Sequence, residues 1–320
     1  MDYLIPSVYL IGEPKCGTTS IYEMLTQHPK VFKSEMKEPR YFASDLIKEG
    51  EEFHEKNGGK RFFRKYFKVK SLLDYQNLYS SKRKDDIAID ASVCYAYSTS
   101  AISNILKKQP SAKFIYVVRN PVDFYPSLYY QKFPEQEHLD INDAWKVSND
   151  RERGREEIPT TAPYPSTLFY KKRVLFSKNL TRVLNQTQNV LIISFEKFKQ
   201  DNIAVIQKIH TWLGLNTKKT RIEPIKTNTR TYKNNSLFHN IVRDPVLWKP
   251  MKKLLPERIY STFRDVYVKL SRSAKAQELE GSVLHELQVT AKQEQRKIKK
   301  LINVRNLDYI GEINWEEEYS

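Results

Sequence analysis

The stretch GEPKCGTTS at residues 12–20 decides the fold, because it joins an apolar segment to an amphipathic one through a glycine-containing loop. The preceding segment SVYLIG (7–12) is β-rich and apolar, and the following segment TTSIYEMLTQH (18–28) repeats its apolar residues at helical spacing. A turn between a strand and a helix directs several backbone N–H groups at one point, where the helix dipole adds positive charge. The sequence therefore predicts a strand, an anion-binding loop and a helix, in that order.

The position of its lysine distinguishes this loop from the phosphate loop of nucleoside triphosphatases. Gly12 and Gly17 have the glycine spacing of the Walker A motif G-x-x-x-x-G-K-[ST], but Thr18 stands where that motif has its lysine. The lysine of this loop is Lys15, inside the turn, and no magnesium-holding carboxylate stands out at another strand end. We therefore expect the loop to bind a smaller terminal anion without a metal.

Further apolar runs alternate with helical segments along the chain. The expected strands are IAID (87–90), KFIYVV (113–118) and VLIISF (190–195), and the expected helices lie at 100–109, after Pro121, and at 202–215. Buried strands that alternate with helices are typical of a parallel sheet covered on both faces. The predicted fold class is therefore α/β, with a central parallel sheet between helices.

We expect a single domain over residues 1–320, because no linker divides the chain. The charged segment 48–70 is interrupted by two glycines and is interpreted as a surface insertion with a partly helical end. The segment 148–166 mixes charge with prolines and is interpreted as a long loop beside a substrate cleft. From residue 251 onward the pattern is mostly helical and charged.

Composition restricts the partners and the compartment. The formal net charge of +16 attracts an anion, such as a phosphorylated cofactor, an acidic glycan, a nucleic acid or a membrane surface. The basic residues are spread along the chain rather than clustered with aromatic residues, which disfavours nucleic acid. Two cysteines build no disulfide framework, and no apolar run is long enough to span a bilayer. If Met1 is the native start, we expect a cytoplasmic, bacterial protein.

Two motifs carry a resemblance to a known family. PKCGTTSIYEML (14–25) resembles the 5′-phosphosulfate loop of the sulfotransferases that use 3′-phosphoadenylyl sulfate (PAPS), above all the carbohydrate sulfotransferases and their bacterial relatives. FIYVVRNPVDFYPSLYY (114–130) resembles the family's 3′-phosphate segment, in which a serine follows the arginine of Arg-x-P by eight residues. Those residues are Arg119 and Ser127 here. An arginine fork at a strand end suits phosphate, and Pro121 suits the start of the next helix.

Other stretches extend the resemblance over nearly the whole chain. KEPRYF (37–42) resembles a segment of the glycosaminoglycan sulfotransferases whose glutamate is the proposed base, and residues 191–215 resemble the strand and helix that follow in most members. The ending, an aspartate followed by INW, is similar to that of many bacterial members. Val93 replaces a frequent proline and Arg40 a frequent histidine, which leaves the acceptor open.

The resemblance implies a P-loop-like sulfotransferase fold and transfer of a sulfuryl group from PAPS to a hydroxyl or amine, with release of 3′-phosphoadenosine 5′-phosphate (PAP). Lys15 would stabilise the charge that develops on the leaving bridging oxygen, which makes it a catalytic residue as well as a cofactor ligand. The implied cofactor-binding residues are Lys15, Cys16, Gly17, Thr18, Thr19, Ser20, Arg119, Ser127, Arg230 and Lys233. The hydroxyls of the first helical turn could instead cap the helix, Cys16 could be loop filler, and Arg230 and Lys233 could belong to a basic surface loop.

The proton of the acceptor hydroxyl needs a general base. Glu38 is the first candidate by the resemblance, against an exposed loop glutamate as the ordinary interpretation. Asp90 is the second, because it ends a strand where parallel sheets bind ligands, although it could cap the next helix. Histidine serves in other branches, so His28, His54 and His210 are further alternatives, and His210 shares a face with apolar residues, which indicates burial.

The acceptor class stays open between a carbohydrate and a small molecule such as a secondary metabolite.

Two other function classes are alternatives to sulfuryl transfer. A kinase or NTPase would bind ATP with Mg²⁺ tightly, and a non-enzymatic basic protein would bind polyanions with steep salt dependence and no need for PAPS. Oligomeric state is not predicted.

Overall fold

The strands of the computed structural model are short and parallel, and most of their residues are buried. The structure describes residues 4–217, 221–225 and 277–315. Within them the strands are β1 (Val8–Gly12), β2 (Val31–Phe32), β3 (Ile87–Asp90), β4 (Lys113–Val118), β5 (Val190–Ser194) and β6 (Asp308–Ile310). They form one parallel sheet in the order β2-β3-β1-β4-β5-β6. The predicted α/β class with a central parallel sheet is confirmed.

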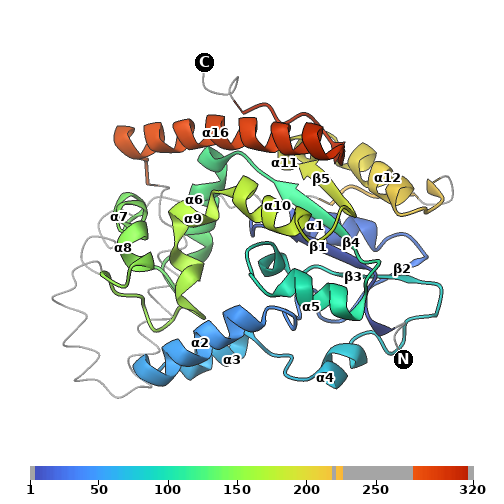
Figure 1. Ribbon diagram of the computed structural model, residues 1–320, viewed down its shortest axis with the longest axis horizontal. Helices are drawn as coiled ribbons and strands as arrows, with labels where there is room; N and C mark the ends of the chain where they lie inside the picture. The colour runs from blue at the N-terminus through green and yellow to red at the C-terminus, as the bar shows by residue number, and fades with distance from the viewer. Residues whose placement is uncertain (1–3, 218–220, 226–276, 316–320) are drawn as a thin grey trace.

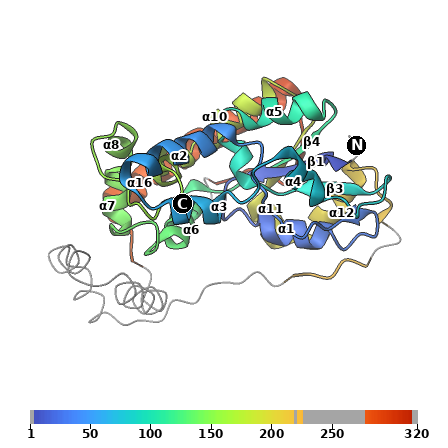
Figure 2. The same ribbon diagram turned by 90° about the horizontal axis from the view of Figure 1, so that it is seen from below.

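Helices cover both faces of this sheet. Figure 2 places α5 (Ala101–Lys108), α10 (Phe176–Leu184) and α16 (Gly281–Arg305) on one side and α1 (Thr18–Leu25), α11 (Phe195–Gln200) and α12 (Asn202–Trp212) on the other. Every residue of β1 and of β5 is buried, as expected for strands covered on both faces. The core therefore runs along the sheet, between the two helical layers.

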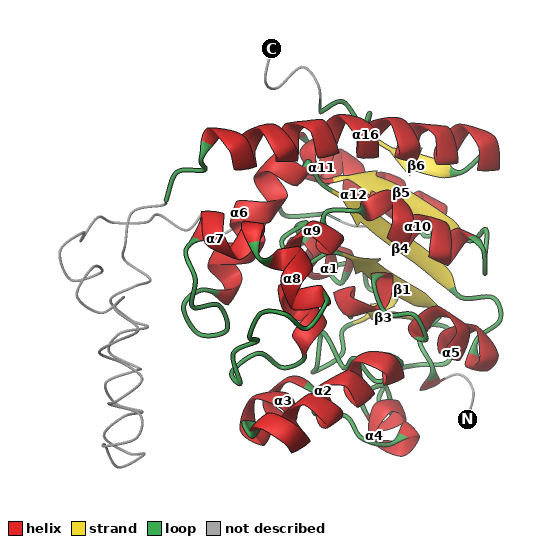
Figure 3. Ribbon diagram, turned by 60° about the vertical axis from the view of Figure 1, so that its left-hand side comes forward, coloured by secondary structure: helices red, strands yellow, loops and turns green. Residues whose placement is uncertain are grey.

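Another group of helices gathers at one end of the sheet (Figures 1 and 3). It comprises α2 (Ser44–Asn57), α3 (Lys60–Tyr66), α6 (Pro121–Lys132), α7 (Ile141–Lys146), α8 (Ser148–Glu152) and α9 (Tyr170–Arg173), while α4 (Leu72–Asn77) lies near α3. The 3₁₀ turns η2 (Val93–Ala96) and η3 (Pro165–Leu168) connect parts of it. The helix α6 begins where β4 ends, so this group borders the carboxyl ends of the strands, where parallel sheets bind ligands.

Several boundaries differ from the sequence predictions for local reasons. The segment 48–70 is mostly helical: α2 occupies it up to Asn57 and α3 spans Lys60–Tyr66, with a break at Gly58 and Gly59, both of which have positive φ. The strand predicted to reach residue 195 ends at Ser194, whose side chain accepts a hydrogen bond from the backbone N–H of Lys197 and so caps α11. The first helix ends at Leu25. The segment 148–166 contains α8 before its loop.

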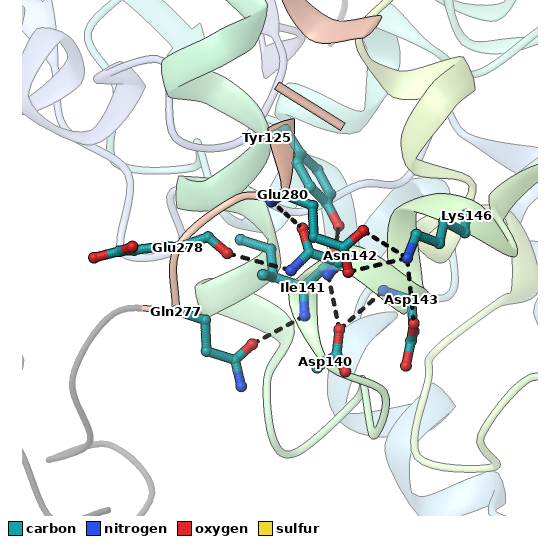
Figure 4. Close-up of polar contacts among 9 residues, drawn as sticks. All are labelled: Tyr125, Asp140, Ile141, Asn142, Asp143, Lys146, Gln277, Glu278 and Glu280. Atoms are coloured by element: carbon teal, nitrogen blue, oxygen red, sulfur yellow. Dashed lines mark hydrogen bonds and ion pairs between the residues drawn. The ribbon is translucent and has the colours of Figure 1, made fainter. Parts of the chain in front are cut away.

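A set of polar contacts, shown in Figure 4, joins residues 277–280 to the start of α7. The backbone N–H of Ile141, at the start of α7, donates to the side-chain oxygen of Gln277 (3.0 Å). Asn142 accepts from the backbone N–H of Glu280 (2.9 Å), and Lys146 forms an ion pair with the carboxylate of Glu280 (2.8 Å). These contacts fix the start of α16 beside α7, so that α16 can pack against α6 and α10.

Candidate active site

The loop between β1 and α1 is shaped by three residues with positive φ. Gly12 (φ 137°) passes so close to β4 that a Cβ there would lie 2.8 Å from the carbonyl oxygen of Val117. Gly17 (φ 73°) packs against α11, and a Cβ there would lie 2.7 Å from the ring of Phe195. Lys15 has φ 70° although it is not glycine, a conformation that the surrounding structure must enforce. The loop is therefore tightly constrained between β4 and α11.

Arg119 joins the two motifs that lie about a hundred residues apart in the sequence. It follows β4, and its guanidinium donates a 2.6 Å hydrogen bond to the backbone carbonyl of Lys15. The same guanidinium lies over the ring of Phe195, 4.6 Å from its centroid. Its buried Nε has no hydrogen-bond partner among the described residues. Arg119 thus supports the loop and keeps donor capacity for a further acceptor.

The hydroxyl groups near the loop make no hydrogen bond with another of the described residues. Gly17 is the N-cap of α1, and no side chain caps this helix, so the capping interpretation of the hydroxyls does not apply. Thr18 and Ser20 are buried and Thr19 is exposed. Within the described chain, no hydrogen bond joins these three hydroxyls or that of Ser127 to another residue. Together with the first N–H groups of α1, they form a set of donors suited to an anion.

Cys16 points into the core from the same loop. It is fully buried, and burial raises the pKa of its thiol. A neutral thiol in this position fills space between the loop and the sheet.

Glu38 lies in the loop after β2 and is held between two cations. Its carboxylate accepts hydrogen bonds from Lys37 (3.0 Å) and Arg40 (2.6 Å), and its side chain is 23% exposed. Burial opposes ionisation, but the charges of Lys37 and Arg40 outweigh it and hold the pKa of Glu38 below its usual value. Arg40 has φ 58°, lies 3.9 Å over the ring of Tyr66 and donates to the carbonyl of Tyr66 (2.9 Å). The Glu38 carboxylate is therefore ionised and fixed in direction.

Asp90, the other predicted carboxylate, is fully buried at the end of β3. It accepts hydrogen bonds from the hydroxyls of Tyr75 (2.8 Å) and Tyr95 (3.0 Å) and from the backbone N–H of Ser92 (2.9 Å). Burial raises its pKa to about 6. The hydroxyl of Ser92 in turn accepts from the backbone N–H of Arg40 (2.9 Å). This geometry gives Asp90 a structural role: through Ser92 it anchors the loop that carries Glu38 and Arg40. It is less suited to a carboxylate that contacts an acceptor.

The three alternative histidines are all buried and bonded to the main chain. His54 contacts the carbonyl oxygens of Gly58 (2.6 Å) and Ala162 (3.0 Å). His28 and His210 face each other with ring centroids 5.0 Å apart, and His210 is fully buried, as its helical spacing indicated. These contacts give each ring a structural role.

Sequence reasoning missed three buried residues with ionisable side chains, Glu13, Arg173 and Lys132. Glu13, which follows Gly12, accepts a 2.7 Å hydrogen bond from the Nε of Arg173, and the guanidinium of Arg173 lies 3.5 Å over the ring of Tyr97. Lys132, in the last turn of α6, is only 6% exposed. The position of Glu13 directly after a buried strand could have indicated that it lies at the site. Nothing in the local sequence indicates that Lys132 or Arg173 is buried.

A cavity of 280 Å³ lies beside the Arg119 end of the site. Its lining residues come from the first turn of α6 and from α11, and they are Asp123, Phe195, Glu196, Lys199 and Gln200. Because Phe195 also lies under Arg119, the cavity borders the region where the 3′-phosphate motif is placed.

Arg230 and Lys233 lie outside the described residues. Among the residues that the structure does describe, no group of three or more His, Cys, Asp or Glu side chains is arranged to hold a metal ion. The same residues contain no helix that is both long and apolar enough to cross a membrane.

Comparisons with known proteins agree on one family. A family model described as a sulfotransferase domain matches residues 6–240. A stretch of 39 residues, 12% of the chain, is 50% identical to human carbohydrate sulfotransferase 15 and spans only 7% of that relative's length. The fold is similar to that of a sulfotransferase from Alicyclobacillus acidocaldarius, with a TM-score of 0.64 and 20% identity over 93% of this chain and 96% of that one. The chain, an α/β sulfotransferase, therefore belongs to the sulfotransferase family whose model it matches.

Proposed function

We propose that this sulfotransferase uses PAPS as donor, transfers the sulfuryl group to a hydroxyl or amine of a carbohydrate or small-molecule acceptor, and releases PAP. The observation that carries the proposal is the hydrogen bond from Arg119 to the carbonyl of Lys15, because it unites the two phosphate motifs at one edge of the sheet. The Nε of Arg119 and the hydroxyls of the first helical turn have no hydrogen-bond partner among the described residues, which fits a ligand with phosphate at both ends.

In this proposal the two anionic groups of PAPS bind at two separate sets of residues. The N–H groups at the start of α1 and the hydroxyls of Thr18, Thr19 and Ser20 would hold the 5′-phosphosulfate, with Lys15 at the crown of the loop. Arg119 and Ser127 would hold the 3′-phosphate. We keep Arg230 and Lys233 as further 3′-phosphate ligands in this proposal. Cys16 contributes through the shape of the loop and not through its thiol.

The chemistry needs a cation at the leaving oxygen and a base at the acceptor. PAPS, when bound, supplies an activated sulfuryl group whose bond to the bridging oxygen breaks as the acceptor attacks. Lys15 would stabilise the charge that develops on that bridging oxygen, an interaction stronger in the transition state than before it. Glu38 would take the proton of the acceptor, because its carboxylate is ionised and held in direction by Lys37 and Arg40. Asp90 is the second candidate base, disfavoured by its burial.

Calorimetric titration with PAP in the absence of magnesium tests the donor assignment. We expect micromolar or tighter binding to the wild type and a loss of at least about tenfold in Arg119→Ala, since a charge-assisted contact is removed. Arg305→Ala is the matched control, because this exposed arginine contacts Asn185 at the far end of α16. Equal binding of PAP by wild type and Arg119→Ala would exclude the proposal. Tight binding of ATP with Mg²⁺ in place of PAP would exclude it too, and would favour the alternative function of a P-loop kinase.

The stretch shared with human carbohydrate sulfotransferase 15 favours a sugar hydroxyl as the acceptor over a secondary metabolite. A panel of sulfate-free glycans and phenols, assayed for PAP release above the rate with water, separates the two classes. Turnover of phenols alone would select the small-molecule alternative.

A further inference from the structure

Arg173, the last residue of α9, contacts the loop between β1 and α1 (residues 13–17), which we call the donor loop. Its side chain is buried, and its Nε donates a 2.7 Å hydrogen bond to the carboxylate of Glu13. A terminal nitrogen of the same guanidinium donates to the same carboxylate oxygen. The guanidinium carbon lies over the ring of Tyr97, 3.5 Å from its centroid. Arg173 is therefore held in one orientation between the donor loop and an aromatic ring.

Further contacts lead from Tyr97 to the candidate base. The hydroxyl groups of Tyr97 and Tyr164 form a 2.6 Å hydrogen bond, and the rings of Tyr164 and Tyr66 meet edge to face with centroids 5.6 Å apart. Arg40 lies 3.9 Å over the ring of Tyr66 and donates a 2.6 Å hydrogen bond to Glu38. Direct contacts thus join the donor loop to the Glu38 carboxylate through a connecting cluster, which comprises Arg173, Tyr97, Tyr164, Tyr66 and Arg40.

A second buried ion pair provides a comparison. Arg151 is as buried as Arg173, and two of its nitrogens bind the two carboxylate oxygens of Glu137. These partners are 14 residues apart, whereas Glu13 and Arg173 are 160 residues apart. A buried ion pair adds little net stability compared with apolar residues of similar volume. What distinguishes the pair of Glu13 and Arg173 is therefore which distant segments it joins.

We propose that Arg173 is a positioning residue for sulfuryl transfer, which acts through the connecting cluster to fix the loop of Glu38 relative to the donor loop. This inference rests on the proposed function, and Arg173 lies outside both sequence motifs. The acceptor oxygen bonds to sulfur as the bond to the bridging oxygen breaks, so the donor and the base must be held in register. A donor that steadies the donor loop would then also steady the loop of Glu38.

Hydrogen–deuterium exchange with and without PAP tests this link and needs no acceptor. In the loop of Glu38, the backbone N–H groups of Arg40 and Phe42 donate to the side chains of Ser92 (2.9 Å) and Tyr95 (3.3 Å), so they exchange when the loop opens. We expect saturating PAP to slow exchange in residues 37–43 by roughly threefold to tenfold in the wild type. In Arg173→Gln the same addition should slow it by less than about twofold, because the link to the donor loop is broken.

A milder variant separates the proposal from damage to the fold. Tyr97→Phe keeps the ring beside Arg173 and removes only the hydrogen bond to Tyr164, so it should bind PAP as the wild type does and still lose most of the slowing. Tyr164→Phe removes the same bond, and the double variant should therefore lose no more than either single one.

Two matched controls remove similar groups elsewhere. Tyr129→Phe deletes another buried hydroxyl, which donates to the carbonyl of Leu139 (3.0 Å), and Arg151→Gln breaks the other buried ion pair. Arg151→Gln should lower stability, because it leaves the carboxylate of Glu137 buried without its cation. Both controls should keep the wild-type slowing by PAP.

The outcomes distinguish this inference from the proposed function. PAP binding without any slowing in residues 37–43 of the wild type would overturn the inference alone. Equal slowing in the wild type, Arg173→Gln and Tyr97→Phe would overturn it as well, because PAP would then act on the loop of Glu38 by another route. No PAP binding to the wild type would overturn the proposed function, and this inference with it.

Discussion

The regions that we propose for the donor and for the acceptor are built in different ways. On the donor side, main-chain geometry sets the shape: positive φ at Gly12, Lys15 and Gly17, and a guanidinium that holds a carbonyl oxygen of the loop. On the proposed acceptor side, charged side chains set the shape: the Glu38 carboxylate is held between Lys37 and Arg40 of its own loop, and the backbone N–H of Arg40 donates to the hydroxyl of the distant Ser92. The comparison teaches that the proposed donor loop depends on backbone conformation, whereas the direction of the proposed base depends on charged side chains and on contacts with distant residues.

The strongest test of this division is Lys15, the one side chain of the donor loop to which we assign chemistry. Lys15→Met should lower the rate of sulfuryl transfer by about 10³-fold, because the charge on the leaving oxygen loses its cation. PAP binding should weaken much less, because Lys15 acts mainly in the transition state. PAP release from PAPS and PAP calorimetry measure the two effects, with exposed Lys30→Met as control. Equal losses in rate and in affinity would make Lys15 an ordinary ligand.

On the acceptor side, Glu38→Gln should lower the transfer rate by about 10²-fold with PAP binding intact. Because Lys37 and Arg40 hold the pKa of Glu38 below its usual value, the carboxylate stays ionised through the neutral range. The rate should therefore fall only when the pH drops below the ordinary carboxylate range, and rate profiles against pH in the two proteins measure this. If Glu38→Gln had the wild-type rate, Glu38 would not be the general base, and another group would have to take the proton.

The backbone of the donor loop is tested by Gly17→Ala. The new Cβ would meet Phe195 at 2.7 Å and force the loop away from α11, so PAP affinity should fall by roughly tenfold, in line with the loss of one good hydrogen bond. Gly214→Ala is the matched control, because Gly214 has a similar φ of 79° with open space around it. Both variants should lose about 1 kcal/mol of stability from the left-handed conformation, but Gly214→Ala should bind PAP normally.

The smallest effect on catalysis is expected from Asp90→Asn, which leaves the shape of its tyrosine cluster unchanged. Burial raises the pKa of Asp90 to about 6, so the folded state binds this proton more tightly than the unfolded state does. The wild type should therefore lose roughly 3 kcal/mol of stability as the pH rises from about 4 to about 6, and the variant should lack this slope.

Urea unfolding at several pH values measures that slope, and transfer rates are compared in parallel. A large loss of rate in Asp90→Asn, with folding and PAP binding intact, would reverse the assignment and make Asp90 the base.

The same contrast explains what could be predicted from the sequence. The strands 87–90 and 113–118 have the predicted bounds, because strands buried on both faces are continuous apolar runs between polar residues. β6 escaped prediction, since it has three residues and two of them are exposed. The single-domain organisation stays a prediction.

For the site, residues 12–20 and Arg119 were found because a backbone motif is local in sequence. Lys132 and Arg173 were not, because the burial of a charge depends on elements that are distant along the chain.

The pairing of β5 with β6 has a consequence for synthesis. Leu191 to Ile193 lie opposite Asp308 to Ile310, so β5 leaves the ribosome long before the strand that covers its outer edge. During that interval the edge of β5 presents unpaired N–H and C=O groups, a template on which another chain can add a strand. Aggregation of nascent chains should therefore be greatest for ribosomes stalled between residues 194 and 308, and a chaperone that shields this edge should raise the yield of folded protein.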